Sequence, residues 1–162
     1  MERGRERWGS AAAFGAAALL LSGCGASAEP VPAEDAVARY DAVAEAVTGA
    51  LPEQGWTLQE NQRSVQEEDG QCVYSPGVWN GDGTLVGVVA DPGWEEIAER
   101  LDPVLAEHGF ESLGSPSRSG ASLRVGTQDE HGAELVIDDQ GTLSLRGALV
   151  DATTCTESAL GL

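Results

Sequence analysis

Two stretches of the chain repeat apolar residues at intervals of three and four, the spacing of one face of a helix. The first covers residues 33–47 ("AEDAVARYDAVAEAV"), and the second covers residues 91–108, from Asp91 to a stop at Gly109. Both predict an amphipathic helix with its apolar stripe turned towards a core. Pro103 lies inside the second stretch and predicts a kink there, or a division into two short helices.

Elsewhere, apolar and polar residues alternate, which is the period of a half-buried strand. The predicted strands are Trp56–Asn61, Gln71–Trp79, Thr84–Ala90, Phe110–Leu113, Ser122–Gln128, Glu134–Asp138 and Thr142–Val150. Turn-rich sequences such as "NGDG", "DEHG" and "DDQG" lie between several of them and predict hairpins. This order of elements predicts an α+β fold, a two-layer sandwich in which an antiparallel sheet carries two helices on one face.

The two halves of this region resemble each other. Leu51-x-x-x-Gly55-Trp56 matches Leu105-x-x-x-Gly109-Phe110, and the triplet Gly-Thr-Leu occurs at 83–85 and again at 141–143. Each half is predicted to be a helix followed by three or four strands. An internal repeat explains this pattern, but so does a general preference for glycine and an aromatic residue between helix and strand. Both explanations stay open.

The N-terminal segment 1–23 follows another pattern. Three arginines, at positions 3, 5 and 7, precede the uncharged Ala/Leu-rich run 9–21, as in a secretory signal peptide. The run is shorter than the roughly 20 residues that a transmembrane helix needs, and the preceding arginines argue against a buried helix of the domain. We therefore assign residues 1–23 to a signal peptide, 24–32 to a short tether and 33–162 to one folded extracytoplasmic domain.

Directly after the apolar run stands Leu21-Ser22-Gly23-Cys24. This sequence resembles the lipobox of bacterial lipoproteins, Leu-small-small-Cys, and the resemblance covers the signal region only. It implies cleavage before Cys24, diacylglycerol on the Cys24 thiol, and a protein held by lipid on the extracytoplasmic side of the cell membrane. Two or three acyl chains hold a protein durably, whereas one anchors it only marginally. Ordinary cleavage nearby, which leaves Cys24 free, is the alternative.

Acidic residues dominate the composition, with 27 Asp and Glu against 9 basic residues and a formal net charge of −18. Removal of residues 1–23 takes away three Arg and two Glu, which leaves 6 − 25 = −19. Such a chain repels phosphate, so nucleic acid is excluded as a partner, and we expect the domain to stand off from anionic lipid. Solubility alone is the alternative reason for this charge. Arginine without lysine, among abundant Ala and Gly, resembles the codon bias of a high-GC genome, and together with the lipobox it suggests an actinobacterial lipoprotein.

Two further cysteines, Cys72 and Cys155, form an even number in an oxidising compartment once lipid occupies Cys24. We predict a disulfide between them, which would close a loop of 155 − 72 = 83 positions and hold the C-terminal segment in place. A metal-binding pair is the alternative, but the chain has no Cys-x-x-Cys spacing and only two histidines.

Little else in the sequence indicates chemistry. Without lysine there is no P-loop lysine, no Ser-x-x-Lys nucleophile and no Schiff base. We expect His108 and His131 to face solvent at a helix end and a hairpin turn, and we predict no catalytic residue, no metal site and no cofactor. Carboxylates are abundant, but no spacing singles out a catalytic pair.

One pair of aromatic residues is a candidate binding surface. Pro76-Gly77 is predicted to bulge or break the strand before Trp79. If the strand resumes with Trp79 exposed, Tyr74 and Trp79 form a binding patch; the alternative places both in the core.

These observations favour a non-enzymatic, lipid-anchored accessory or binding protein of the bacterial cell envelope, which contacts an envelope protein or a small ligand. A carboxylate-based hydrolase of the envelope and a structural or decoy surface antigen are the alternatives.

Overall fold

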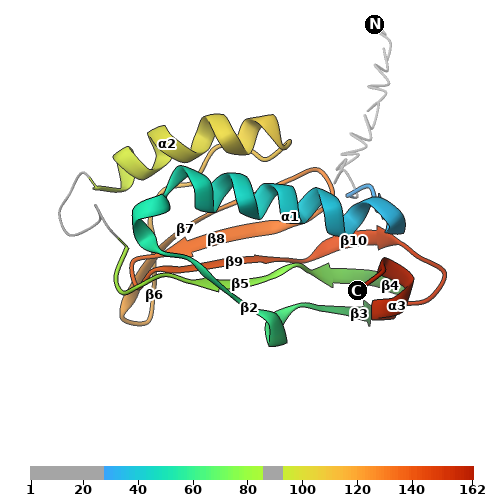
Figure 1. Ribbon diagram of the computed structural model, residues 1–162. Coiled ribbons are helices and arrows are strands. Elements are labelled where there is room, and N and C mark those ends of the chain that lie inside the picture. The colour runs from blue at the N-terminus through green and yellow to red at the C-terminus, as the bar shows by residue number, and fades with distance from the viewer. Residues whose placement is uncertain (1–27, 86–92) are drawn as a thin grey trace, which may run out of the picture.

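Strands and helices lie in two layers in the computed structural model, which describes residues 28–85 and 93–162 (Figure 1). The described strands form two sheets. One sheet contains, in spatial order, β1 (Val31–Pro32), β10 (Ala148–Asp151), β4 (Gln71–Ser75) and β3 (Ser64–Glu68). The other contains β2 (Thr57–Gln59), β5 (Gly77–Asn80), β9 (Thr142–Arg146), β8 (Glu134–Asp138), β7 (Ser122–Gln128) and β6 (Ser117–Ser119).

Two long helices, α1 (Ala33–Ala50) and α2 (Gly93–Glu107), lie on the same side of the strands in Figure 1. The predicted α+β class is therefore confirmed. Short 3-10 turns η1 (Pro52–Gln54) and η2 (Glu60–Gln62) flank β2, and a third helix, α3 (Glu157–Leu160), contacts α1 near the C-terminus.

The helices bury the faces that their sequence period predicts. The buried residues of α1 are Ala36, Tyr40, Val43, Ala44 and Val47, and those of α2 include Ile97, Leu101 and Leu105. The helix α2 is not divided at Pro103. Because Pro103 and Glu99 are both exposed, water can reach the Glu99 carbonyl that loses its amide partner.

Gly109 ends α2 as predicted. Its φ is 81°. The amide of Phe110 donates to the Leu105 carbonyl at 3.0 Å. A left-handed glycine with this hydrogen bond is the pattern of a Schellman cap. The predicted N-cap Asp91 lies outside the described residues.

A continuous antiparallel ribbon connects the two sheets. Tyr74 pairs with Ala148 in one sheet, and Gly77 pairs with Leu145 in the other. In an antiparallel pair, the residue numbers of partners have a constant sum as long as the register is kept. Both pairs sum to 222, so the register does not change between β4 and β5 or between β9 and β10. The break at Pro76 that the sequence predicts is confirmed, and Gly147 marks the matching break in the partner strand.

The alternating pattern predicted some strands better than others. The bounds of β7 and β8 are those expected, whereas Phe110–Leu113 forms only one isolated bridge, from Phe110 to Asp129. The alternating pattern did not predict β1, β3 and β6, and β1 pairs with β10 in parallel. Most of the predicted strand 84–90 lies outside the described residues. The internal repeat stays a prediction.

The folded domain begins earlier than residue 33. Val31 is 2% exposed within β1, and the amide of Glu29 donates to the Glu130 carbonyl at 3.2 Å. Residues 29–32 therefore belong to the domain rather than to the tether. The signal peptide and Cys24 lie outside the described residues. Among the helices of the described parts, none has the length and hydropathy of a membrane span.

Candidate functional site

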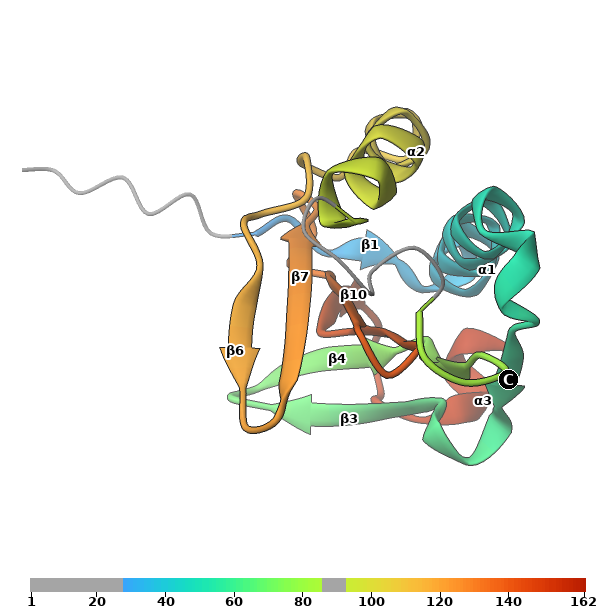
Figure 2. The same cartoon turned by 90° about the vertical axis from the view of Figure 1, so that its left-hand side faces the viewer.

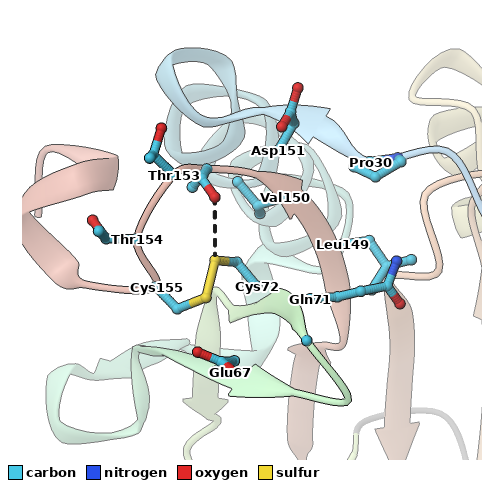
Figure 3. A pocket seen from close by; sticks show the side chains of 12 residues that line it. Pro30, Glu67, Gln71, Cys72, Leu149, Val150, Asp151, Thr153, Thr154 and Cys155 are labelled. Carbon is cyan, nitrogen blue, oxygen red and sulfur yellow. Dashed lines mark hydrogen bonds between the residues drawn. A yellow bond between two sulfur atoms is a disulfide. The ribbon is translucent and has the colours of Figure 1, made fainter.

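The predicted disulfide between Cys72 and Cys155 is present, with a Cα–Cα distance of 5.1 Å (Figure 3). Cys72 lies on β4 and is buried, while Cys155 follows the loop after β10. The dashed contact in Figure 3 joins Cys72 Sγ to the Ala152 carbonyl oxygen over 3.7 Å. Since the oxidised sulfur has no hydrogen to donate, this contact packs the loop against the strand.

A cavity of about 340 Å³ lies beside this disulfide. Its walls come from the β3–β4 turn, from β10 and from residues 151–155, and Pro30 stands at its rim (Figure 3). The charged residues that line it are Glu67 and Asp151, on opposite sides of the disulfide. A cavity lined by carboxylates and no basic group does not favour an anionic ligand.

Tyr74 and Trp79 do not form the exposed patch that the sequence allowed. Tyr74 is fully buried and Trp79 is 8% exposed. Gly77, with a φ of 147°, changes which alternate residues face the core, so Tyr74 before the break and Trp79 after it both point inwards. The alternative interpretation, core packing, is correct.

Trp79 nevertheless forms part of an open groove between α1 and the β2–β5 region. The groove has a volume of about 480 Å³. Its lining residues are Asp41, Ala44, Glu45, Thr48, Leu58, Glu60, Arg63 and Trp79, and we call this set the α1 groove. Ala44, Leu58 and Trp79 supply apolar wall, whereas four of the other lining residues carry charge.

Arg63 is held tightly at the edge of the α1 groove. Its guanidinium pairs with the Asp41 carboxylate at 2.5 Å, and its Nε donates to the Pro76 carbonyl at 2.9 Å. The Arg63 side chain is only 17% exposed. Burial lowers the pKa of Arg63, but the hydrogen bond with Asp41 and neighbouring negative charge outweigh it and raise that pKa. Arg63 thus neutralises Asp41.

The remaining carboxylates of the α1 groove, Glu45 and Glu60, are exposed and have no ion pair within the described residues. The α1 groove therefore presents two carboxylates without a direct ion pair next to an apolar wall, and the positive charge of Arg63 acts on Glu60 from a greater distance.

Tyr74 is buried close enough to the Asp41–Arg63 pair for their charges to act on its phenol. Burial raises the pKa of Tyr74 to about 12, with Arg63 lowering it and Asp41 raising it. The phenol stays protonated at neutral pH, and its oxygen has no hydrogen-bond partner in the described parts of the chain.

A second polar cluster, absent from the sequence analysis, surrounds buried Asp129 at the β7–β8 turn. Tyr40 Oη donates to Asp129 Oδ2 at 2.9 Å, and the amides of His131 and Ala133 donate to Asp129 Oδ1 at 2.9 Å each. Burial, followed by the Asp129 charge, raises the pKa of Tyr40. The "DEHG" turn held part of the signal, because an Asp at this position often accepts from the backbone two residues on.

His131 does not face solvent as expected. Its side chain is 13% exposed, and its Nδ1 lies 2.5 Å from the Glu29 carbonyl oxygen. It therefore helps to hold the start of the domain. His108 directly follows α2, and its carbonyl accepts a hydrogen bond from Arg39 at 3.4 Å. No group of three or more His, Cys, Asp or Glu side chains able to hold a metal occurs among the described residues.

No protein-family model and no curated protein matches this sequence. Among solved structures, the chain is similar to that of the candidate lipoprotein LppA from Mycobacterium tuberculosis. The identity is 15%, the match covers 82% of this chain and 83% of that chain, and the TM-score is 0.48. Similarity at this level establishes neither a family nor a function.

Proposed function

We propose that this protein is a non-enzymatic, lipid-anchored binding protein on the outer face of the cell membrane, and that its α1 groove accepts a cationic group of an envelope partner. The observation that carries the proposal is the pair Glu45 and Glu60, exposed and without a direct ion pair among the described residues, beside the apolar wall of the α1 groove. The lipobox resemblance at Cys24 supports the location.

The chemistry of the α1 groove suits a lysine or arginine side chain. Such a side chain lays its methylene stem on apolar surface and keeps its charged end among polar groups. Here Leu58 and Ala44 would contact the stem, and Glu45 and Glu60 would attract the charge. The net charge of −19 that remains after removal of residues 1–23 raises the rate of encounter with a basic partner over a longer distance.

Calorimetric titration of the full chain in detergent with tetralysine tests this binding. Because any polycation is attracted to so acidic a protein, the control must change the charge equally at another place. Glu45→Gln with Glu60→Gln should weaken binding by about tenfold, or about 1.4 kcal/mol. Glu99→Gln with Glu107→Gln, two exposed positions on α2, should weaken it far less. Equal weakening by both pairs contradicts a site in the α1 groove.

Anchoring has its own test. Intact-mass spectrometry and membrane fractionation should show lipid on the wild-type protein and none on Cys24→Ala, which should leave the membrane fraction. Ser22→Ala keeps a small residue in the lipobox and should behave as wild type. A Cys24→Ala protein that remains with the membrane contradicts the anchor.

The hydrolase alternative stays a prediction. It requires two carboxyl groups that face one scissile bond, and no observation on the described residues favours a particular pair.

A further inference from the structure

We propose that the anchored domain turns its β7–β8 turn towards the lipid surface and carries the α1 groove away from it. This inference rests on the lipid anchor at Cys24 proposed above. It assigns a membrane-facing end to the domain, defined here by Glu29, Glu130, His131 and Gly132.

The first step is the attachment of residue 29 to this end. The amide of Glu29 donates to the Glu130 carbonyl at 3.2 Å, and His131 Nδ1 lies 2.5 Å from the Glu29 carbonyl oxygen. The amide of Leu149 donates to the His131 carbonyl at 3.0 Å, which joins the same turn to β10. Two residues later, Val31 pairs with Val150 and is buried. The chain is thus fixed to the β7–β8 turn before Pro30 and to β10 after it.

The second step is the length of chain that remains. Only four residues separate Cys24 from Glu29. At no more than about 3.6 Å per residue, the Cys24 Cα lies within about 18 Å of the Glu29 Cα. An acylated Cys24 sits at the lipid surface, so the tether limits how far Glu29, and Glu130 hydrogen-bonded to it, can move from that surface.

The opposite end of the six-stranded sheet lies well away from this attachment. The strand β7 runs from Ser122 to Gln128. A strand of this length separates the β7–β8 turn from the β6–β7 turn by roughly 20 Å. Figure 2 shows the β6–β7 turn at the far end of β7 from the place where the described chain enters the domain. Gln140, in the β8–β9 turn, lies at that same far end, because β8 runs antiparallel to β7.

The same geometry places the α1 groove. The helix α1 begins at Ala33, next to the attached segment, and ends at Ala50. At the rise of an α-helix it extends about 27 Å. Figure 1 shows its last turns at the opposite end of the sheets from its first. The α1 groove runs along the second half of α1, from Asp41 near the middle of the helix to Thr48 on its last turns. Repulsion from anionic headgroups acts on the whole acidic domain, including Glu29 and Glu130, but the tether restrains only the end at Glu29, so the rest of the domain is favoured to lie further from the lipid.

The test uses the full lipidated chain in vesicles that contain anionic phospholipid and a headgroup-labelled nitroxide lipid. A fluorophore is placed at Glu130→Cys or at Gln140→Cys, both exposed, with Cys72 and Cys155 kept as the disulfide. Quenching at position 130 should be at least about twice that at position 140, because collisional quenching requires contact with the headgroup region. Equal or reversed quenching on protein that still floats with the vesicles overturns the orientation and leaves the anchor intact.

A variant with a longer tether distinguishes orientation by the tether from direct binding of the domain surface to lipid. Insertion of a 20-residue Gly/Ser segment after Gly25 should reduce quenching at position 130 to the level at position 140. Persistence of the difference would mean that the surface of the domain itself binds lipid, which overturns orientation by the tether. Loss of flotation with no lipid mass on Cys24 overturns the anchor, and this inference with it.

Discussion

Gly77, the first residue of β5, and Gly147, between β9 and β10, lie where the antiparallel ribbon passes from one sheet to the other, and both have positive φ, 147° and 82°. On each strand the core-facing positions shift by one residue at the glycine. They are Cys72 and Tyr74, then Gly77 and Trp79, on one strand, and Leu143 and Leu145, then Ala148 and Val150, on the other. The paired shift keeps the register and turns both halves of the ribbon towards the helices.

Gly77→Ala should therefore lower the free energy of unfolding by about 1–3 kcal/mol. A side chain at φ 147° is strained, and the new Cβ would lie 2.9 Å from Leu58 Cδ1. Chemical denaturation of the full chain measures the loss. The matched control is Gly49→Ala inside α1, where no atom lies within 4 Å of the new Cβ. This control should gain up to about 1 kcal/mol from helix propensity. Equal stability of the two variants would contradict the role assigned to Gly77.

Removal of the disulfide should free the C-terminal segment before the rest of the fold. Cys72→Ala with Cys155→Ala is expected to lower the free energy of unfolding by about 2–5 kcal/mol, since the bond closes a loop of 83 positions. Hydrogen exchange should accelerate most in residues 152–162, where Leu160 alone is buried. A reductant should reproduce this pattern in the wild type and leave the double variant unchanged. Uniform acceleration over the whole domain would contradict local release.

The alternating pattern predicted some strands correctly because the same alternate positions face the core along their whole length. In β7 and β8, residues such as Val125, Leu135 and Ile137 hold one phase throughout, and the predicted bounds agree with the structure. In residues 71–80, the set of alternate positions that faces the core changes at Gly77. Both an exposed and a buried Trp79 agreed with the sequence there, because the outcome depends on a backbone angle that the pattern does not encode.

The candidate sites also fall into those that the sequence predicts and those that it does not. The lipobox and the disulfide could be predicted from the sequence, because each depends on the residue types present and on the cell compartment. The α1 groove depends on Asp41 meeting Arg63 across 22 positions, and the Asp129 cluster depends on Tyr40, 89 positions away. Such contacts arise when the helices pack on the sheets, so the spacing of residues within one short segment does not predict them.

Tyr40 and Tyr74 should respond in opposite ways to loss of their hydroxyl groups. Tyr40→Phe removes the bond to Asp129 and leaves Oδ2 without that donor, so the free energy of unfolding should fall by about 1–3 kcal/mol. Tyr74→Phe removes a buried hydroxyl that has no partner among the described residues, so stability should stay level or rise. Thermal and chemical denaturation measure both. Equal losses would show that Tyr74 has a partner, such as a bound water, and would contradict this distinction.

Glu53 should make part of the free energy of unfolding depend on pH in the acidic range. The hydrogen bond from Arg100 lowers the pKa of Glu53 from 4.5 to about 2. A carboxyl whose pKa is lower in the folded than in the unfolded state contributes its full stabilisation above pH 4.5 and loses it as the pH falls towards 2.

Because this pair is exposed, Glu53→Gln should lower the free energy of unfolding by no more than about 1 kcal/mol at pH 7. The difference from wild type should shrink steadily between pH 4.5 and 2.5 in a series of urea denaturations. Glu107→Gln changes the net charge equally, on an exposed position of α2, and should show no such narrowing. If both variants follow the same pH dependence, general charge repulsion is responsible, and the bond from Arg100 to Glu53 contributes nothing specific.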